Sequence, residues 1–179
     1  MLFRSKMSGY ADAYDLFTPD LGELAFLADE KAPHPFYTRG FLLAQEDDVP
    51  PLLQRALEHG NCPKNMIIKG SKDYVVLNGQ IAATVDAPSV ASMECIGGTG
   101  DLVTGLATAF LCANTRQGDA NMGESCTAAA RMARLLAQYC APNPGTQIAE
   151  LIEKLPEALT AARSVWPPSL LSAPDQAPA

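Results

Sequence analysis

The chain has 179 residues, a formal net charge of −7 and a sequence pI near 4.7. With 47% hydrophobic and 18% charged residues it can bury a core, and its length indicates one domain or a domain with a tail. The acidic balance argues against a nucleic-acid partner, because neutralising nucleic-acid phosphates requires clustered Lys and Arg. A small anion stays compatible with this charge, since a local backbone site can hold it.

Two short strands and two helices are predicted in the first part of the chain. The limits of the two helices follow from apolar residues at helical spacing and from prolines near the helix ends. In chain order the predicted elements are a strand at 14–18, a helix at 22–30, a helix at 49–59 and a strand at 65–69. Between the helices, the Pro-His-Pro-Phe-Tyr segment at 33–37 is either a rigid loop with aromatic packing or a lid beside a ligand.

A β-hairpin is predicted next. The β-prone runs 73–77 and 80–85 flank the pair Asn78-Gly79, which is typical of a type I′ turn. Residues 86–96 are expected to form an irregular connection to the helical part of the chain.

Three helices are predicted in the second half, at 99–113, at 123–140 and from Pro144 toward Val165, where Pro156 either kinks the third helix or restarts it. Their spacing predicts two inward faces: Leu102, Val103, Leu106, Phe110 and Leu111 on the first helix, and Cys126, Ala130, Ala133, Leu136 and Ala137 on the second.

No apolar run is long enough to span a bilayer, and the first residues lack the hydrophobic region of a signal peptide. We therefore expect no membrane partner and a cytoplasmic location.

The five cysteines are scattered along the chain, and none forms a CxxC pair. This spacing predicts neither a zinc site nor a disulfide framework and favours a reducing compartment. Cys112, Cys126 and Cys140 fall on apolar helical stripes and are expected to be small core residues.

The sequence CIGGTGDLVTGL at 95–106 is the densest chemical signal. Its glycines precede a long helix, where backbone N–H groups and the helix dipole can form an anion hole. Asp101, in the first turn, could act there as a general base. In the alternative interpretation, Thr99 or Asp101 caps the helix and the glycines serve a tight loop. The pattern matches neither a Walker A motif nor the Rossmann glycine motif.

The segment GGTGDLVTG resembles the glycine-rich anion hole of the ribokinase-like superfamily. Within it, the sequence is most similar to the ATP- or ADP-dependent NAD(P)H-hydrate dehydratases, the YjeF-like relatives of carbohydrate kinases. Two more segments resemble that family in the same order: IIKG at 67–70, and TPDLGE at 18–23, where Asp20 and Leu21 replace the His-Pro of the family's TPHPGE.

The alternation of strands and helices predicts an α/β domain. The resemblance implies the nucleotide-binding half of a three-layer ribokinase-like fold, with a mixed, mostly parallel sheet, a β-hairpin and flanking helices. It implies one truncated domain over 1–165, and the Pro- and Ala-rich composition of residues 166–179 predicts a loosely held tail. Such a half-domain would leave an apolar sheet edge, near 15–18 or 65–69, and we expect a homo-oligomer or a partner chain to cover it.

The resemblance also implies a role for each matched residue. Asp101 would activate a substrate hydroxyl, and Lys69 and Gly70 would lie near the nucleotide phosphates. Glu23 would organise Mg²⁺ through water. The backbone N–H groups that would stabilise the transferred phosphoryl group belong to Gly97, Gly98, Thr99 and Gly100. Without the resemblance, Lys69 is equally a solvated lysine at a strand end, and Glu23 an ordinary helix-start glutamate.

The predicted function is ATP or ADP binding with Mg²⁺ and a small-molecule substrate. If the chain is an enzyme, the resemblance implies NAD(P)H-hydrate dehydratase activity, which is a lyase reaction, or a kinase reaction with Asp101 as the base. The alternative is a non-catalytic nucleotide-sensing or assembly subunit that lacks the substrate-binding half. A purely structural α/β subunit is the third hypothesis.

Overall fold

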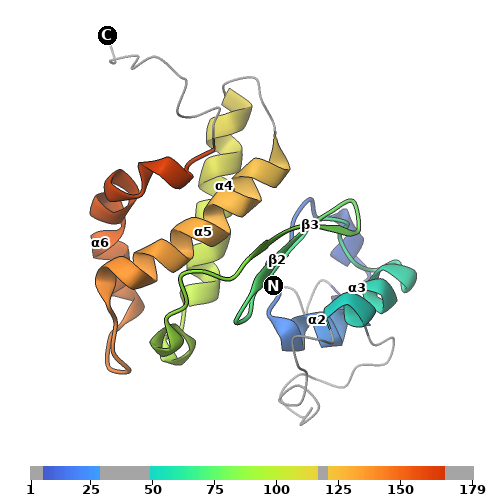
Figure 1. The fold of residues 1–179 in the computed structure, drawn as a ribbon. Coiled ribbons are helices and arrows are strands. Elements are labelled where there is room, and N and C mark those ends of the chain that lie inside the picture. Colours follow the sequence, from blue (N-terminus) through green and yellow to red (C-terminus); the bar gives the residue numbers. More distant parts are fainter. Residues whose placement is uncertain (1–5, 29–48, 117–120, 168–179) are drawn as a thin grey trace. The chain divides into compact units, whose positions relative to one another are not determined.

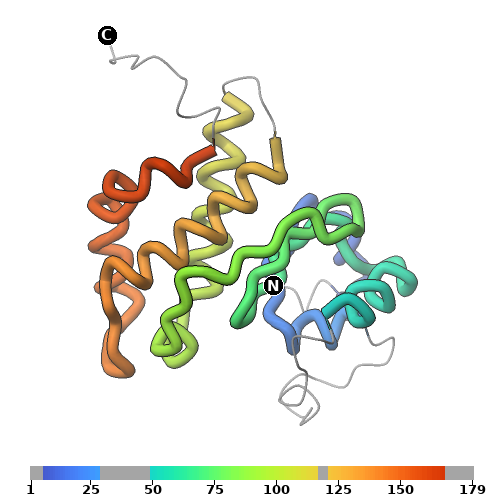
Figure 2. Tube along the Cα trace, viewed as in Figure 1, coloured from blue at the N-terminus to red at the C-terminus, as the bar shows by residue number. Residues whose placement is uncertain are grey.

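The computed structural model of the chain describes residues 6–28, 49–116 and 121–167. It divides into two compact units, Met1–Thr84 and Val85–Ala179, and each unit is described here by itself. Figure 1 labels the α-helices and the strands β2 and β3, and Figure 2 traces the chain through them. The segment at 33–37 and the tail from residue 168 onward lie outside the described residues.

The first unit is built from two helices and a small sheet (Figure 1). Its elements are η1 (Ala11–Ala13), α2 (Leu21–Ala28), α3 (Val49–Glu58), β1 (Met66–Ile68), β2 (Asp73–Leu77) and β3 (Gln80–Val85). The strand order is β1-β2-β3, and β1 pairs antiparallel with β2, so that Ile67 lies opposite Val75. The predicted helix at 49–59 and strand at 65–69 are confirmed, and so is the mixture of helix and sheet.

The predicted parallel character of the sheet is wrong for the described strands, since the three-stranded sheet is antiparallel. The physical reason is the length of the connections: β1, β2 and β3 are joined by turns of a few residues, and parallel neighbours need a long crossover. Among the described residues, parallel pairing consists of two isolated bridges, Phe17 with Met66 and Asp20 with Lys69. Since these bridges lie on one side of the 66–69 segment and β2 pairs on the other, the alternative that placed the open sheet edge at 65–69 is wrong. The other alternative, an open edge near 15–18, stays a prediction.

The hairpin between β2 and β3 is confirmed at the predicted residues. Asn78 and Gly79 have φ values of 51° and 80°, the left-handed pair that a type I′ turn requires. A Cβ at Gly79 would lie 3.1 Å from Leu57 Cδ1, so α3 packs against this turn.

The core of the first unit lies between the two helices and one face of the sheet. Its fully buried members include Leu24 and Leu27 from α2 and Met66, Ile68 and Val76 from the strands. Val49, Leu52, Leu53 and Ala56 from α3 complete it at helical spacing.

The second unit is helical and centres on α5. Its elements are η5 (Ala91–Cys95), α4 (Thr99–Arg116), α5 (Met122–Cys140), α6 (Ile148–Ala161) and η6 (Arg163–Val165). Helix α5 packs against both α4 and α6, and all five residues of its predicted inward face are buried. The buried side chains of Asn114 and Ser125 join α4 to α5 through a hydrogen bond of 2.7 Å. Pro156 lies inside α6, which continues past it.

The predicted inward face of α4 is confirmed only in part. Leu102, Leu106 and Phe110 are buried, whereas Val103 and Leu111 are half-buried. Within this unit α4 packs against α5, which covers a narrower stripe than the one predicted.

The cysteines differ in their environments. Cys126 is buried as predicted, Cys140 is half-buried, and Cys112 is exposed because it lies off the stripe of α4 that packs on α5. Burial raises the pKa of the Cys126 thiol to about 11 and that of Cys62 to about 12. Over the described ranges, no helix combines the length and apolar character needed to cross a membrane.

Candidate functional site

The predicted site residues fall into two groups, one in each unit. Glu23, Lys69 and Gly70 belong to the first unit, and residues 97–101 belong to the second. The structure brings Glu23 and Lys69 together, and it places residues 97–101 at the start of α4.

Gly98 immediately precedes α4 and adopts a backbone conformation that favours glycine. Its φ is +97°, and its carbonyl accepts the first helical hydrogen bond from the Leu102 N–H at 3.0 Å. A Cβ at Gly98 would lie 3.1 Å from Ile148 Cγ1 of α6. Gly98 is therefore required here by its backbone conformation and by packing, apart from any ligand.

The first amides of α4 lack a protein acceptor in the described part of the chain. A helix is normally capped by a side-chain oxygen of the residue before its first turn, and Gly98 has no side chain. The Thr99 hydroxyl donates to the Ile96 carbonyl at 3.2 Å. Among the described residues, no oxygen accepts from the N–H of Gly100 or Asp101. These two groups are available to an anion.

At the starts of α5 and α6, unlike at the start of α4, the protein supplies an acceptor for the third backbone amide. At α5, Asn121 Oδ1 accepts from the Glu124 N–H at 3.1 Å. At α6, the Glu150 N–H donates to the Gln147 carbonyl at 3.0 Å, and the Glu150 side chain accepts from the Gln147 N–H at 2.8 Å. The protein thus satisfies the third amide of α5 and of α6 but leaves that of α4 free within the described ranges.

Asp101 occupies the third position of α4, and its side chain is exposed. A carboxylate there is favoured by the helix dipole and can exchange a proton with a ligand held at the neighbouring amides. Gly97 is also exposed, and a Cβ on it would meet no atom within 4 Å, so there is open space on this side of the turn.

In the first unit, Asp20 and Glu23 form a reciprocal pair at the start of α2. The Glu23 N–H donates to Asp20 Oδ1 at 2.7 Å, and the Asp20 N–H donates to Glu23 Oε2 at 2.8 Å. This is the capping-box arrangement, with Asp20 before the helix and Glu23 in its third position. The role of Asp20 was missed, although the spacing Asp-x-x-Glu before an apolar helix would have indicated it.

Lys69 lies beside this pair. Its Nζ is 4.0 Å from Glu23 Oε2, and its backbone is bridged to Asp20. Both side chains keep about a fifth to a quarter of their surface exposed, at 21% for Lys69 and 24% for Glu23. Gly70, at the end of the same segment, donates its N–H to Asp73 Oδ1 at 3.3 Å.

Burial raises the pKa of the Glu23 carboxyl above its ordinary value of 4.5, and the negative charge of Asp20 adds to the rise. The hydrogen bond from the Asp20 N–H and the charge of Lys69 act in the opposite direction. A nearby cation would stabilise the charged form of a partly buried carboxylate of this kind. Mg²⁺ commonly binds through one or two carboxylates, water and phosphate oxygens, which fits Glu23. Within the described ranges, no group of three or more His, Cys, Asp or Glu forms a protein-only metal cage.

The charge on Glu23 should make a small, pH-dependent contribution to stability. Since the native state holds this proton more tightly than the unfolded chain, ionising Glu23 opposes folding once the pH exceeds 4.5. Glu23→Gln keeps an acceptor for the Asp20 N–H. We expect its free energy of unfolding, relative to wild type, to rise between acidic and neutral pH by up to about 1 kcal/mol.

Urea denaturation over this pH range measures the difference. Glu157→Gln is the matched control, because Glu157 also faces a lysine, Lys154 at 3.5 Å, but is 59% exposed. A Glu23→Gln variant that loses stability relative to wild type as the pH rises would contradict this account of Glu23.

The chain is similar to an uncharacterized protein of Methanocaldococcus jannaschii, MJ1337, with 38% identity over 159 residues. The match covers 88% of this chain and 66% of the archaeal protein, so the chain spans just under two thirds of that relative's length. No protein-family model matches the chain, and no solved structure matches it.

Proposed function

We propose that the start of α4 binds a phosphate group of ATP or ADP, and that Asp101 is the base of a ribokinase-like phosphoryl transfer. The observation that carries this proposal is the glycine-capped start of α4, where the described chain provides no acceptor for the N–H groups of Gly100 and Asp101. Uncapped amides at a helix N-terminus favour a bound anion.

The resemblance of GGTGDLVTG to the ribokinase-like anion hole supports a nucleotide phosphate as the anion. In the transfer, Asp101 takes the proton of a substrate hydroxyl, whose oxygen attacks the terminal phosphorus as the bond to the leaving nucleotide breaks. The amides stabilise the charge on the phosphoryl oxygens. In a kinase the phosphorylated substrate is the product. In an NAD(P)H-hydrate dehydratase the phosphate is then eliminated, and the reduced nicotinamide ring is restored.

Lys69 and Glu23 are assigned supporting roles by the same resemblance. Lys69 would neutralise nucleotide phosphate charge, and Glu23 would hold water molecules of Mg²⁺, the ion that neutralises phosphate oxygens when bound. Their proximity, 4.0 Å between Lys69 Nζ and Glu23 Oε2, supports a shared role.

A second function, nucleotide sensing without turnover, is favoured by a different observation. Asp20 stands where the family has a histidine, and it holds the Glu23 carboxylate in a helix-capping box at 2.7 and 2.8 Å. A carboxylate occupied in this way has a structural role that does not depend on catalysis. The chain would then keep the anion site and transfer no phosphoryl group.

Titration calorimetry of the full chain with ADP and Mg²⁺ tests nucleotide binding. We expect a 1:1 complex and a melting temperature that rises with ADP concentration. Lys69→Ala should weaken ADP binding by about tenfold, the scale of one charge-assisted hydrogen bond. The matched control is Lys154→Ala, which removes a lysine paired with a glutamate on α6 and should leave ADP binding unchanged. Absence of binding heat and of a thermal shift with both ADP and ATP would overturn the proposal.

A further inference from the structure

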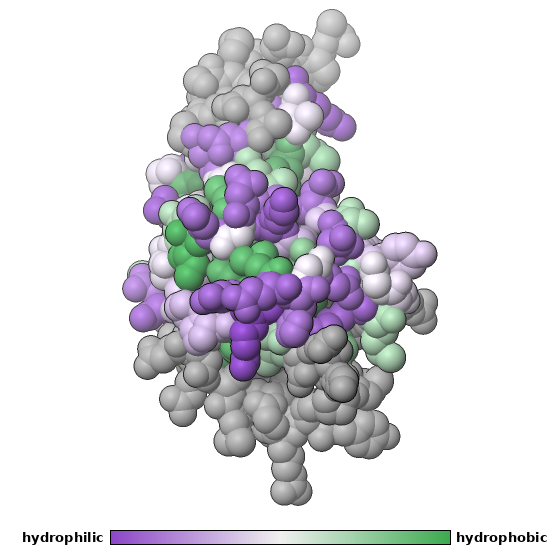
Figure 3. All heavy atoms as spheres, turned by 90° about the vertical axis from the view of Figure 1, so that its right-hand side faces the viewer, coloured by the Kyte–Doolittle hydropathy of each residue, from purple (hydrophilic) through white to green (hydrophobic). Residues whose placement is uncertain are grey.

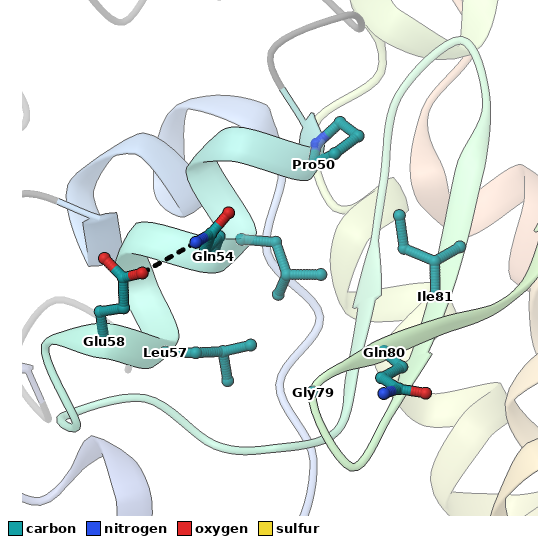
Figure 4. Close-up of a pocket in the computed structure, with 8 residues that line it drawn as sticks. Pro50, Gln54, Leu57, Glu58, Gly79, Gln80 and Ile81 are labelled. Carbon is teal, nitrogen blue, oxygen red and sulfur yellow. Dashed lines mark hydrogen bonds between the residues drawn. The ribbon is translucent and has the colours of Figure 1, made fainter.

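An open groove runs between α3 and the β2–β3 hairpin of the first unit (Figure 4). It has a volume of about 530 Å³, and its floor is apolar, formed by Leu53, Leu57 and Ile81. Gln54 and Glu58 stand on its helical side, joined by a hydrogen bond of 2.9 Å. Ile81 is 38% exposed, whereas the core residues Leu53 and Val76 are buried. On the face shown in Figure 3, apolar side chains gather beside polar and charged ones.

The strand that borders this groove, β3, is an edge of the sheet. In the order β1-β2-β3, no described strand pairs with its second side. In a two-residue hairpin the residues next to the turn, here Leu77 and Gln80, form a hydrogen-bonded pair, and the pattern then alternates along the strand. The N–H and C=O groups of Ile81 and Ala83 therefore point to the open side.

This edge lacks the features that usually prevent pairing. Sheet edges are protected by lysines, prolines or inward-pointing charges, and β3 reads QIAATV, without any of these. The chain carries a net charge of −7, but the six residues of β3 are uncharged, so two paired β3 strands place no like charges against each other. A basic peptide would find one carboxylate beside this edge, that of Glu58 on the helical side of the groove, and none on the strand.

We propose that β3 pairs antiparallel with β3 of a second copy of the chain, with Ile81 of each copy opposite Ala83 of the other. This pairing is independent of nucleotide binding. It joins two three-stranded sheets into one and satisfies the outward N–H and C=O groups of both residues.

Side-chain size selects this register. It sets a large residue against a small one, so the Ile81 side chain lies over Ala83 of the second copy, beside the groove. Two neighbouring registers keep the backbone groups in phase. One would place Ile81 opposite Val85, which is 4% exposed and already covered. The other would place the two Ile81 side chains opposite each other and set Ala83 against the turn residue Gly79, which has no side chain. In the proposed register Ala82 of one copy faces Ala82 of the other as a non-hydrogen-bonded pair, with Cα atoms about 4.5 Å apart.

Sedimentation velocity of the full chain at micromolar concentration tests the proposal. We expect a species of twice the 19.0 kDa mass of the chain, and Ile81→Lys should weaken association at least tenfold. The control Gln138→Lys adds the same charge at an exposed position of α5 and should stay dimeric. A monomeric wild type, or an Ile81→Lys protein that dimerises as wild type does, would overturn the proposal.

A cross-link tests the register without disrupting the strand. In a background with the exposed Cys95 and Cys112 replaced by Ser, Ala82→Cys should form a disulfide-linked dimer under mild oxidation, because the Cα separation of this pair suits a disulfide. The same background without the new cysteine should stay uncross-linked. A dimer in sedimentation that Ala82→Cys leaves uncross-linked would contradict this register.

Discussion

Asp101→Asn is expected to lower phosphoryl-transfer turnover by about 10²- to 10⁴-fold, the range of a lost general base. Asparagine has nearly the same shape but cannot take the proton of the attacking hydroxyl. Because Asp101 is exposed, the dissociation constant for ADP should change by no more than about fivefold. Turnover is measured as nucleotide- and Mg²⁺-dependent recovery of NADH from its hydrate, or as ADP release from ATP with a hydroxyl acceptor.

Glu124→Gln is the matched control for this variant. Glu124 also occupies the third position of a helix in the second unit, but its N–H is already bonded to Asn121 Oδ1. It should keep wild-type turnover. If wild type shows no turnover and still binds ADP, the sensing function is favoured over the enzyme. If Asp101→Asn keeps full turnover, Asp101 is not the base.

Gly98→Ala is expected to lower both stability and ADP affinity. An alanine at a φ of +97° is strained, and its Cβ would lie 3.1 Å from Ile148 Cγ1. The free energy of unfolding should fall by about 1–3 kcal/mol, as measured by urea denaturation. The shift this forces on the start of α4 should also misplace the free amides. ADP affinity should then fall by about tenfold or more, the value of one charge-assisted hydrogen bond.

Gly105→Ala is the control for Gly98→Ala, because it shows whether replacing a different glycine of α4 also lowers stability and ADP affinity. Gly105 lies in the same helix, and a Cβ on it would meet no atom within 4 Å. Alanine there should preserve ADP binding and raise stability by about 0.5–1 kcal/mol, since glycine disfavours a helix interior. A Gly98→Ala protein as stable as wild type and with equal ADP affinity would contradict the structure of this turn.

The hairpin and the inward face of α5 could be predicted because their signals are local. Asn78-Gly79 specifies a turn whatever surrounds it, and the apolar spacing of α5 is continuous over several turns. The exposure of Cys112 could not be predicted in the same way. Periodicity gives the direction of an apolar face, but its width depends on how much of the helix a neighbour covers, and α4 packs on α5 along a narrow stripe.

The direction of a strand relative to its neighbours depends on partners distant in the sequence. The mostly parallel sheet implied by the resemblance was therefore the part of the fold that was predicted wrongly. The pattern of a strand shows which residues are buried, but not which strand it joins. The short turns at residues 70–72 and at Asn78-Gly79 do imply antiparallel neighbours. Phe17 pairs with Met66 of β1, and Asp20 pairs with Lys69, the residue after β1, each as an isolated parallel bridge.

At the candidate site the sequence indicated the residues but not all of their contacts. The need for glycine at position 98 could be foreseen, whereas its contact with Ile148 joins segments 50 residues apart. The capping box of Asp20 and Glu23 was within reach of sequence reasoning, because it depends only on a three-residue spacing. The pairing of Glu23 with Lys69 could not be predicted from the sequence, because it depends on the bridge that brings Lys69 beside Asp20.

The most direct test of the central claim is an amide NMR titration of the ¹⁵N-labelled chain with ADP and Mg²⁺. If the free N–H groups of Gly100 and Asp101 bind phosphate, the largest saturable shifts will fall on these two residues and on their neighbours Gly98 and Thr99. The capped amide of Glu124 at the start of α5 serves as the internal reference and should move little. The account would be contradicted if the amide signals of these four residues did not shift, or if the Glu124 signal shifted as much as that of Asp101.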